Sequence, residues 1–201
     1  MRNVIFVIAA AALVASAATA QSPAPVEQAY TPLDLNRCRH QKGQGPEDYG
    51  AWQCAGYGGI AVLVSGADQR VTVSFGPNAA NEPAASQSLP AFNSEGKTIE
   101  WRIERGEGGV RRAFATILRW NTSVTQDSGA DYKGQVLVVT RLGPGGVCHV
   151  GYVDGRANRN ANELSQQIAD KHARGFNCKT DKPIVLGIKG PGFSANLDGP
   201  Q

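Results

Sequence analysis

The 201-residue chain is predicted to form an α+β domain, an antiparallel β-meander of about six to seven strands with one C-terminal helix packed on it and two disulfides. Three observations lead to this prediction. Runs of alternating apolar residues follow one another through the middle of the chain, joined by short Gly-rich turns. A single strongly marked helical pattern comes late in the chain. The four cysteines are an even number, as expected for a disulfide-stapled domain.

Residues 1–20 have the pattern of a secretory signal peptide. Arg2 precedes an apolar run over residues 4–14, and the segment ends in Ala18-Thr19-Ala20, a small-x-small sequence typical of a cleavage site. The run is shorter than an ordinary transmembrane helix requires. The alternatives to a cleaved signal peptide are an uncleaved anchor and a buried helix. Residues 21–32 contain Pro and Ala without periodicity, so we expect a flexible leader there.

The first hairpin is expected over residues 60–75. Its second strand places Val71, Val73 and Phe75 on one face, and a turn over residues 66–69 joins the two strands. The following stretch, residues 76–90, is rich in Pro, Asn, Ala and Ser and is therefore expected to be a long surface loop.

The second hairpin is expected over residues 97–120. Ile99, Trp101 and Ile103 alternate with charged residues, and a Gly-rich turn follows at residues 105–109. One face of these strands is apolar and the other is mixed, which favours an antiparallel sheet with one buried side. We find no internal repeat. The sheet is expected to continue with a polar loop over residues 121–133 and strands over residues 135–141 and 147–154.

The helix is expected to begin at Asn160, because Asn160 and Glu163 have the N-cap and N3 chemistry of a capping box. Gly175 suits the position just past its end. The helical stripe comprises Ala161, Leu164, Ile168 and His172.

The chain length fits one folded domain, which we expect to cover residues 33–188. Residues 184–188 are expected to add an edge strand to the sheet. Residues 189–201 are expected to be a disordered tail.

The cysteines are expected to form the disulfides Cys38–Cys54 and Cys148–Cys178, although the count alone permits three pairings. About seven strand residues run roughly 23 Å outward and about fourteen helical residues roughly 21 Å back, so Cys178 returns to Cys148. A redox pair, a metal site and a thiol nucleophile are the alternatives. Neither Cys-x-x-Cys nor the tight ligand pairs of a structural zinc site occurs in the sequence.

The formal net charge is +3, and removal of Arg2 with the signal peptide leaves it near +2. This charge is too small to indicate nucleic acid or anionic lipid as a partner. Five arginines around the second hairpin form a candidate contact patch for an acidic envelope protein or an anionic envelope polymer. Because glutamates are interleaved with them, a solvated face with cross-strand ion pairs is the competing interpretation. The arginine patch consists of Arg102, Arg105, Arg111, Arg112 and Arg119.

The candidates for catalysis are His149, Asp154 and His172, but no local motif assembles them. Gly-x-Ser-x-Gly and His-Glu-x-x-His are both absent from the sequence. A metal pair of the two histidines would lack a third ligand, so no metal or cofactor is expected. The glycine clusters at residues 56–59 and 143–146 lead into strands and are interpreted as turns, not as phosphate loops.

The run Cys54-Ala55-Gly56-Tyr57-Gly58-Gly59 and the block Val153-Asp154-Gly155-Arg156-Ala157-Asn158 resemble segments of small exported proteins of alphaproteobacteria that have no established activity. The resemblance covers most of the mature chain, including the four cysteines. It implies a bacterial periplasmic location and brings no ligand or catalytic residue with it.

These observations favour an exported, non-catalytic envelope protein, periplasmic or secreted, that acts as a binding or inhibitor-like module. The alternative is a small periplasmic hydrolase whose site is assembled from residues distant in sequence. In that case His149→Ala and His172→Ala should each remove most of the activity, because a positioned acid or base contributes about 10² to 10⁴ in rate.

Overall fold

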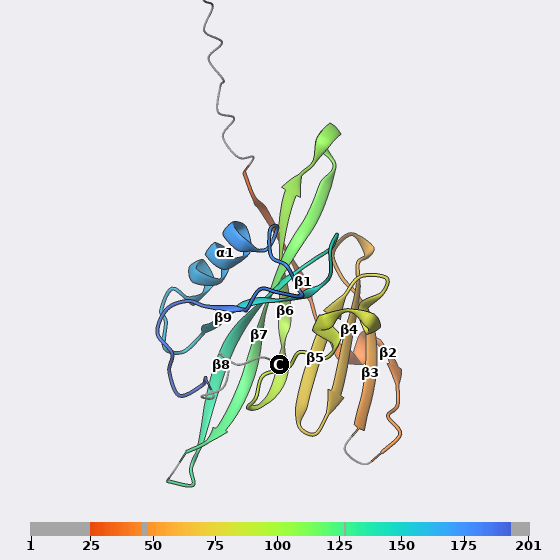
Figure 1. Cartoon of the computed structure of the whole chain (residues 1–201). Coiled ribbons are helices and arrows are strands. Elements are labelled where there is room, and N and C mark those ends of the chain that lie inside the picture. The colour runs from red at the N-terminus through yellow and green to blue at the C-terminus, as the bar shows by residue number, and fades with distance from the viewer. Residues whose placement is uncertain (1–24, 46–47, 127, 194–201) are drawn as a thin grey trace, which may run out of the picture.

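The computed structural model describes residues 25–45, 48–126 and 128–193, which form two β-sheets and one α-helix (Figure 1). The larger sheet contains β1 (Glu27–Pro32), β6 (Phe92–Arg105), β7 (Arg111–Thr125), β8 (Asp131–Arg141), β9 (Cys148–Asp154) and β10 (Ile184–Val185), paired in that order. The smaller sheet contains β2 (Arg39–Gln41), β3 (Asp48–Ala55), β4 (Ala61–Ala67) and β5 (Arg70–Phe75), also in that order. All these pairings are antiparallel except that of β10, which runs parallel to β9.

The molecule has three layers, with the larger sheet between the smaller sheet and helix α1 (Ala161–His172) (Figure 1). One set of buried side chains, here called the inter-sheet core, joins the two sheets and includes Val64, Phe75, Trp101 and Trp120. A second set, the helix-side core, packs α1 on the opposite face of the larger sheet. It includes Ile117, Leu137, Val150 and Ile168.

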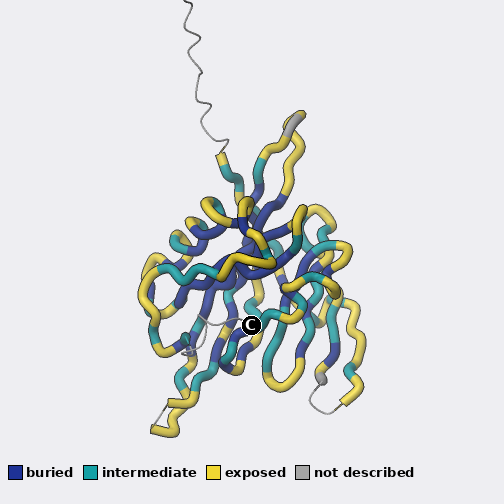
Figure 2. Tube along the Cα trace, in the orientation of Figure 1, coloured by how far each residue is buried: buried dark blue, intermediate teal, exposed yellow. Residues whose placement is uncertain are grey.

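The larger sheet is therefore buried on both faces in its centre, as Figure 2 shows for the middle of β7, β8 and β9. The expectation of one buried side is wrong for these strands. The reason is visible in β8, where four consecutive residues, 136–139, are all buried, because alternate side chains point into different cores.

The two predicted hairpins are confirmed. In the first, β4 and β5 pair through Ala67 and Arg70, and the two residues between them, Asp68 and Gln69, have φ of 46° and 57°. Two left-handed residues give the turn the twist that a two-residue hairpin requires. The second hairpin, β6–β7, is longer than predicted at both ends, because its ladder continues from Ile99 and Leu118 to Phe92 and Ser123.

Helix α1 begins where the sequence predicts, directly after Asn160, but the capping box does not form. The Asn160 side chain makes no cap hydrogen bond, and the backbone N–H of Ala161 donates to the carbonyl of Asn158, 3.3 Å away. Ala161 and Ile168 are buried as expected. His172, which the helical pattern places on the same stripe, is exposed.

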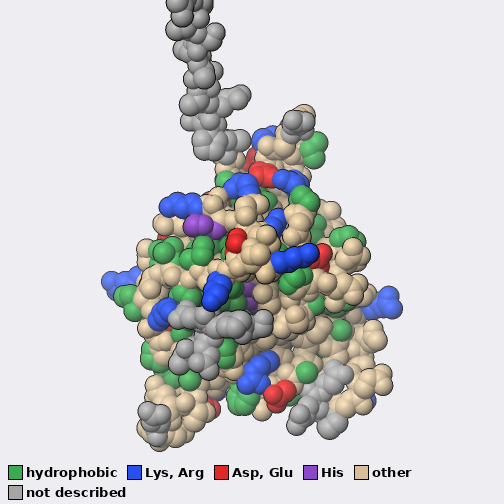
Figure 3. All heavy atoms as spheres, viewed as in Figure 1, with side chains coloured by type: hydrophobic (Ala, Val, Ile, Leu, Met, Phe, Trp, Pro, Cys, Tyr) green, Lys and Arg blue, Asp and Glu red, His purple; other side chains and the backbone are tan. Residues whose placement is uncertain are grey.

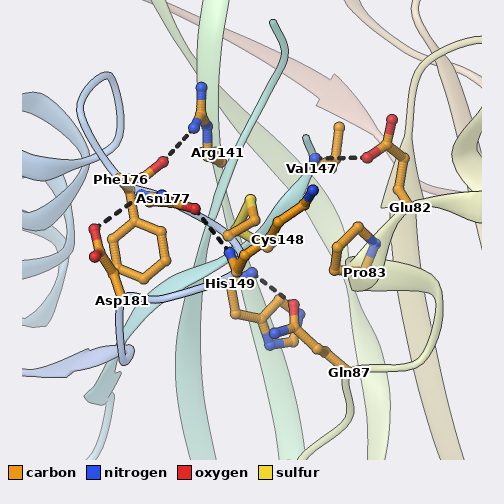
Figure 4. The surroundings of a disulfide bond; sticks show 12 residues. Glu82, Pro83, Gln87, Arg141, Val147, Cys148, His149, Phe176, Asn177 and Asp181 are labelled. Carbon is orange, nitrogen blue, oxygen red and sulfur yellow. Dashed lines mark hydrogen bonds between the residues drawn. A yellow bond between two sulfur atoms is a disulfide. The ribbon is translucent and has the colours of Figure 1, made fainter. Parts of the chain in front are cut away.

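Both predicted disulfides are present, Cys38–Cys54 and Cys148–Cys178. The second joins β9 to the segment that follows α1 (Figure 4). Around it, the Arg141 guanidinium donates to the carbonyl of Phe176, and the Asn177 N–H donates to the Asp181 carboxylate at 2.8 Å. The return of the chain after the helix is therefore held covalently and by hydrogen bonds.

The leader expected over residues 21–32 is not flexible at residues 27–32, because β1 pairs with β6 along its whole length. The Trp101 indole N–H also donates to the Thr31 hydroxyl at 2.8 Å. The tail expected over residues 189–201 is ordered through residue 193. There the Gly190 N–H donates to Asp154, and Phe193 packs against the inter-sheet core. The proposed signal peptide and residues 194–201 lie outside the described residues.

Two expected loops also differ from the structure. Residues 76–90 include two 3-10 turns (Ala79–Asn81 and Pro83–Ala85) and bury Ala84 and Leu89, so this segment is not a surface loop throughout. The Glu82 and Gln87 side chains accept the N–H groups of Val147 and His149, each at 2.8 Å (Figure 4). The polar loop expected over residues 121–133 is mostly strand, since residues 121–125 of β7 pair with residues 131–135 of β8.

The α+β class is confirmed, with ten strands in the described part of the chain instead of the expected six to seven. Among the residues described, no helix has the length and apolar character needed to cross a membrane.

Candidate functional site

A cleft of about 530 Å³ lies between α1 and the outer face of β1, β6 and β7, and we call it the helix cleft. The helix contributes Asn162 and Gln166, and the apolar floor is formed by Ile117 and Leu137 of the helix-side core. Most of the other lining side chains are polar or charged. They come from β1, β6 and β7 and are Tyr30, Lys97, Thr98, Glu100, Arg119 and Asn121.

The position of the cleft follows from how α1 packs. Ile168 and Ala169, in the second half of the helix, are buried against the larger sheet. Asn162 and Gln166 in the first half are polar and line the open space instead. The cleft is therefore walled by a helix and strands that the core holds in place, which suits a binding site.

Arg102 does not line the cleft but binds the lining residue Glu100 as part of a buried ionic network. Its guanidinium donates two hydrogen bonds to Asp170 of α1, at 3.0 and 2.7 Å, and one to Glu100 at 3.0 Å. Burial alone would lower the pKa of Arg102, but its bonds to Asp170 and Glu100 raise the pKa above its ordinary value. Gln166 donates to the same Glu100 oxygen at 2.9 Å, so this network ties the helix to β6.

Arg119 reaches the cleft from β7 and binds only neutral partners. Its two terminal nitrogens donate to the amide oxygens of Gln135, at 3.1 Å, and Asn162, at 2.9 Å. In the described ranges no carboxylate lies within 4.0 Å of the Arg119 nitrogens, and burial lowers the pKa of its guanidinium. The charge of Arg119 is therefore not compensated by a neighbouring acid.

Glu95 lies on β6 beside the cleft and is half-buried. It lies opposite Trp120 in the β6–β7 ladder, so its side chain is on the face of the sheet that Trp120 buries in the inter-sheet core and not on the face of Arg119. Burial raises the pKa of the Glu95 carboxyl above its ordinary value, and no basic side chain of the described residues forms an ion pair with it. Arg119 therefore faces the cleft without an acidic partner among the described residues, and Glu95 does not supply one.

The other members of the arginine patch are paired. Arg105 and Arg111 bind the two carboxylate oxygens of Glu27, at 2.7 and 2.8 Å, and Arg112 pairs with Glu104. Arg102 is buried, as described above. On the face drawn in Figure 3, basic side chains are interspersed with acidic ones. These contacts match the interpretation of the arginine patch as a sheet face with cross-strand ion pairs. Arg119 is the one member of the patch without an ion pair in the described residues.

The structure does not bring the three catalytic candidates together. His149 is fully buried in the layer between the sheets, where its ring stands edge-on to Trp120 and Tyr152. Asp154 is also buried, and its carboxylate accepts the backbone N–H groups of Arg156, Ala157 and Gly190. His172 is exposed on α1, on the other side of the larger sheet from His149.

The metal pair considered for the two histidines has no geometric support, and the described residues contain no group of three or more His, Cys, Asp or Glu side chains that could hold a metal ion. Burial lowers the pKa of His149 to about 3, so its imidazole is neutral near pH 7. Its Nδ1 lies 3.0 Å from the Tyr152 hydroxyl.

Sequence reasoning missed the helix cleft. Of its lining residues, only Arg119 was singled out, and it was assigned to an outward-facing patch. Thr98 is on β6 and Asn162 and Gln166 are on α1, and these residues share no motif. The one available signal was the polar side of α1, which carries Asn162 and Gln166 one helical turn apart.

Comparison with known proteins found no match to this chain among protein-family models, curated proteins or solved structures.

Proposed function

We propose that this chain is an exported, non-catalytic binding protein of the bacterial envelope, and that the helix cleft holds its ligand. The observation that carries the proposal is a cleft of about 530 Å³ whose walls present charged and amide side chains over an apolar floor. Cavities of this size, with a few polar groups placed around apolar surface, are the usual form of a small-molecule site.

The cost of leaving charges without partners also supports a binding role. A half-buried charge loses hydration that only a hydrogen-bonded or charged partner restores. Arg119 has no charged partner within the described chain. A fold that used Arg119 only for stability would gain more from pairing it with an acid, as it does for Arg102 and Asp170.

A non-catalytic role is favoured over hydrolysis by the positions of the catalytic candidates. His149 and Asp154 are fully buried and hydrogen-bonded within the fold, and neither lines the helix cleft. The two disulfides are compatible with an oxidising compartment outside the cytoplasm.

The proposal is tested by nuclear magnetic resonance with isotope-labelled protein and pools of amino acids, short peptides, sugars and nucleotides. The side-chain amide signals of Asn121, Asn162 and Gln166 report directly on the cleft. At least one pool should shift these signals in the wild type. Thr98→Trp, which places a large ring in the cleft, should abolish the shift.

The matched control is Val110→Trp, which adds the same ring at the exposed tip of the β6–β7 hairpin, where Val110 is 67% exposed. This variant should bind as the wild type does. The proposal fails if no pool moves the cleft signals, or if a pool moves them equally in Thr98→Trp.

A further inference from the structure

Arg119 brings a positive charge into the helix cleft that no acid of the described residues neutralises. Leu118 and Trp120, its neighbours along β7, belong to the inter-sheet core, and Ile117 belongs to the helix-side core. Because side chains alternate along a strand, Arg119 is on the helix-facing side with Ile117. Its hydrogen bond to Asn162 of α1, at 2.9 Å, agrees with this placement.

The guanidinium of Arg119 is held in a defined orientation. Nη1 donates to the amide oxygen of Gln135 on β8, at 3.1 Å, and Nη2 donates to that of Asn162. Gly155 lies against the same group, because a Cβ added at this glycine would come within 2.5 Å of Nη1. A guanidinium has further N–H donors in its planar fork, which are left for a ligand. The acceptors that match this fork are carboxylate and phosphate groups.

The other charges beside the cleft favour a ligand with a single negative charge. Glu100 lines the cleft and belongs to a network in which one arginine, Arg102, binds two acids, Glu100 and Asp170. The excess negative charge of this network repels a dianionic phosphate more than a carboxylate. Lys97, the other cation among the lining residues, is exposed, so solvent screens its charge. A carboxylate is therefore the better match to Arg119.

The helix side of the cleft offers one hydrogen-bond donor and one acceptor to the rest of the ligand. The side-chain oxygen of Asn162 accepts from Arg119, so its amino group is left to donate. The side-chain amino group of Gln166 donates to Glu100 at 2.9 Å, so its oxygen is left to accept. These two amides are one helical turn apart. Hydroxyl groups match such a pair, because a hydroxyl both donates and accepts.

We infer that the ligand of the helix cleft is a small hydroxylated monocarboxylate, of the chemical class of the sugar acids. Its carboxylate binds Arg119, and its hydroxyl groups bind Asn162 and Gln166. The inference rests on the proposed binding function and names the ligand class of that same cleft. The apolar floor, formed by Ile117 and Leu137, packs against the C–H surface of the ligand.

The test compares D-glucuronate with three probes that each change one feature. D-glucose lacks the carboxylate, propionate lacks the hydroxyl groups, and glucose 6-phosphate carries a phosphate in place of the carboxylate. Titrations are followed at the side-chain amide signals of Asn162 and Gln166. Glucuronate should bind most tightly. Glucose should bind at least about tenfold more weakly, because it loses a charge-assisted contact. Propionate and glucose 6-phosphate should also bind more weakly than glucuronate.

Arg119→Gln connects the charge of the ligand to one residue. This variant should bind glucuronate at least about tenfold more weakly than the wild type, because the charge-assisted contact is lost, and its affinity for glucose should change little. The matched control is Arg105→Gln, the same substitution at an exposed arginine that pairs with Glu27 outside the cleft. The control should bind glucuronate as the wild type does.

Gly155→Ala tests the same contact without removing the charge, and it keeps the inference testable if Arg119→Gln disturbs α1. The added Cβ displaces Nη1 of Arg119 from its position between Gln135 and Asn162. Binding of glucuronate should weaken in this variant more than binding of glucose. Arg119→Lys, which keeps the charge but loses the planar fork, should have an affinity between those of the wild type and Arg119→Gln.

The outcomes separate the inference from the proposed function. If glucose binds as tightly as glucuronate, or glucose 6-phosphate binds more tightly, the carboxylate assignment is wrong and the cleft is still a ligand site. The same holds if Arg119→Gln and Gly155→Ala bind glucuronate as the wild type does. If propionate binds as tightly as glucuronate, the assignment of the hydroxyl groups is wrong. If neither these probes nor the ligand pools shift the cleft signals, the proposed function fails as well.

Discussion

His149 shows how the surroundings of a residue decide its role. From the sequence, His149 was a candidate for catalysis with Asp154 and His172, and for a metal pair with His172. In the fold its side chain is completely buried, Nδ1 contacts the Tyr152 hydroxyl, and Nε2 has no hydrogen-bond partner among the described residues. Desolvation then disfavours the charged form of the ring, so His149 is a neutral residue of the interior.

This environment predicts a pH-dependent stability. The folded pKa of His149 is about 3 against an ordinary value of 6.5, so between these values the unfolded chain binds a proton that the folded protein does not. The free energy of unfolding should therefore fall as the pH drops below 6.5, with a contribution from His149 of about 2 to 3 kcal/mol between pH 7.5 and pH 4.5. His149→Gln, which keeps a hydrogen-bonding group but does not titrate, should lose this contribution.

The measurement is urea-induced unfolding at the two pH values. His172→Gln changes an exposed histidine and is the matched control. Equal pH dependence in the wild type and in His149→Gln would contradict the assignment of a buried neutral imidazole.

The strands show which parts of the fold follow from the local sequence pattern and which depend on pairing with distant residues. Hairpins β4–β5 and β6–β7 were predictable because their apolar residues alternate on either side of a short turn, which is rich in glycine in β6–β7. Residues 56–60 and 106–110 share the sequence Gly-x-Gly-Gly-Ile/Val and form the same turn, in which the first N–H donates to the last carbonyl at 2.8 Å. In each turn the last two glycines have positive φ, which explains why glycine is used there.

Strand β1 was not predictable in this way, because residues 27–32 have no clear apolar alternation and their stability comes from contacts with distant residues. Glu27 pairs with Arg105 and Arg111, Gln28 accepts a hydrogen bond from Arg102, and the strand follows the edge of β6. These partners lie about 70 residues or more away along the chain.

A chain that begins at residue 33 is therefore expected to be less stable than one that begins at residue 25. The free energy of unfolding should fall by at least about 3 kcal/mol, because a ladder of hydrogen bonds and the ion pairs of Glu27 are lost together. Urea unfolding followed by tryptophan fluorescence would measure the difference. Thr31→Val in the longer chain isolates the single bond from Trp101 and should cost only about 1 kcal/mol. Equal free energies of unfolding for the two chains would mean that β1 does not stabilise the fold.

At the scale of the whole molecule, the two disulfides hold different parts of the three layers. Cys38–Cys54 closes a short loop at the edge of the smaller sheet, with a sequence separation of 16. Cys148–Cys178 spans a separation of 30 and encloses α1, so it limits how far the helix can move from β9. Only the second disulfide therefore bears on the wall of the helix cleft.

From the two disulfides we predict how many cysteines can be alkylated and how much stability each disulfide contributes. Intact mass after alkylation should show no modified cysteine in the unreduced protein and four after reduction in denaturant. Replacing both cysteines of a pair by serine should cost about 3 kcal/mol for Cys38–Cys54 and about 3.5 to 4 kcal/mol for Cys148–Cys178, because the longer loop loses more entropy when it is closed. Alkylation of the unreduced protein would refute the disulfide framework.

The helix cleft also depends on residues that are distant in the sequence. Its residues come from α1, β1, β6 and β7, and the chain between Tyr30 and Gln166 must fold before they share one surface. No spacing rule connects Glu100 with Arg119, because the offset between two paired strands is set by the turn and by the bulges in the ladder.

By itself the sequence determined the α+β class, the two central hairpins, the start of the helix and the two disulfide pairings. These features depend on contacts between residues near one another in the chain, or on the count and placement of four cysteines. Only the tertiary structure decided that there are two sheets, that β1 and the segment to residue 193 belong to the fold, and that Arg119 and Asn162 meet in one cleft. The physical reason is that these features depend on which distant strands pair and which faces they bury, and this is set by the packing of the whole chain.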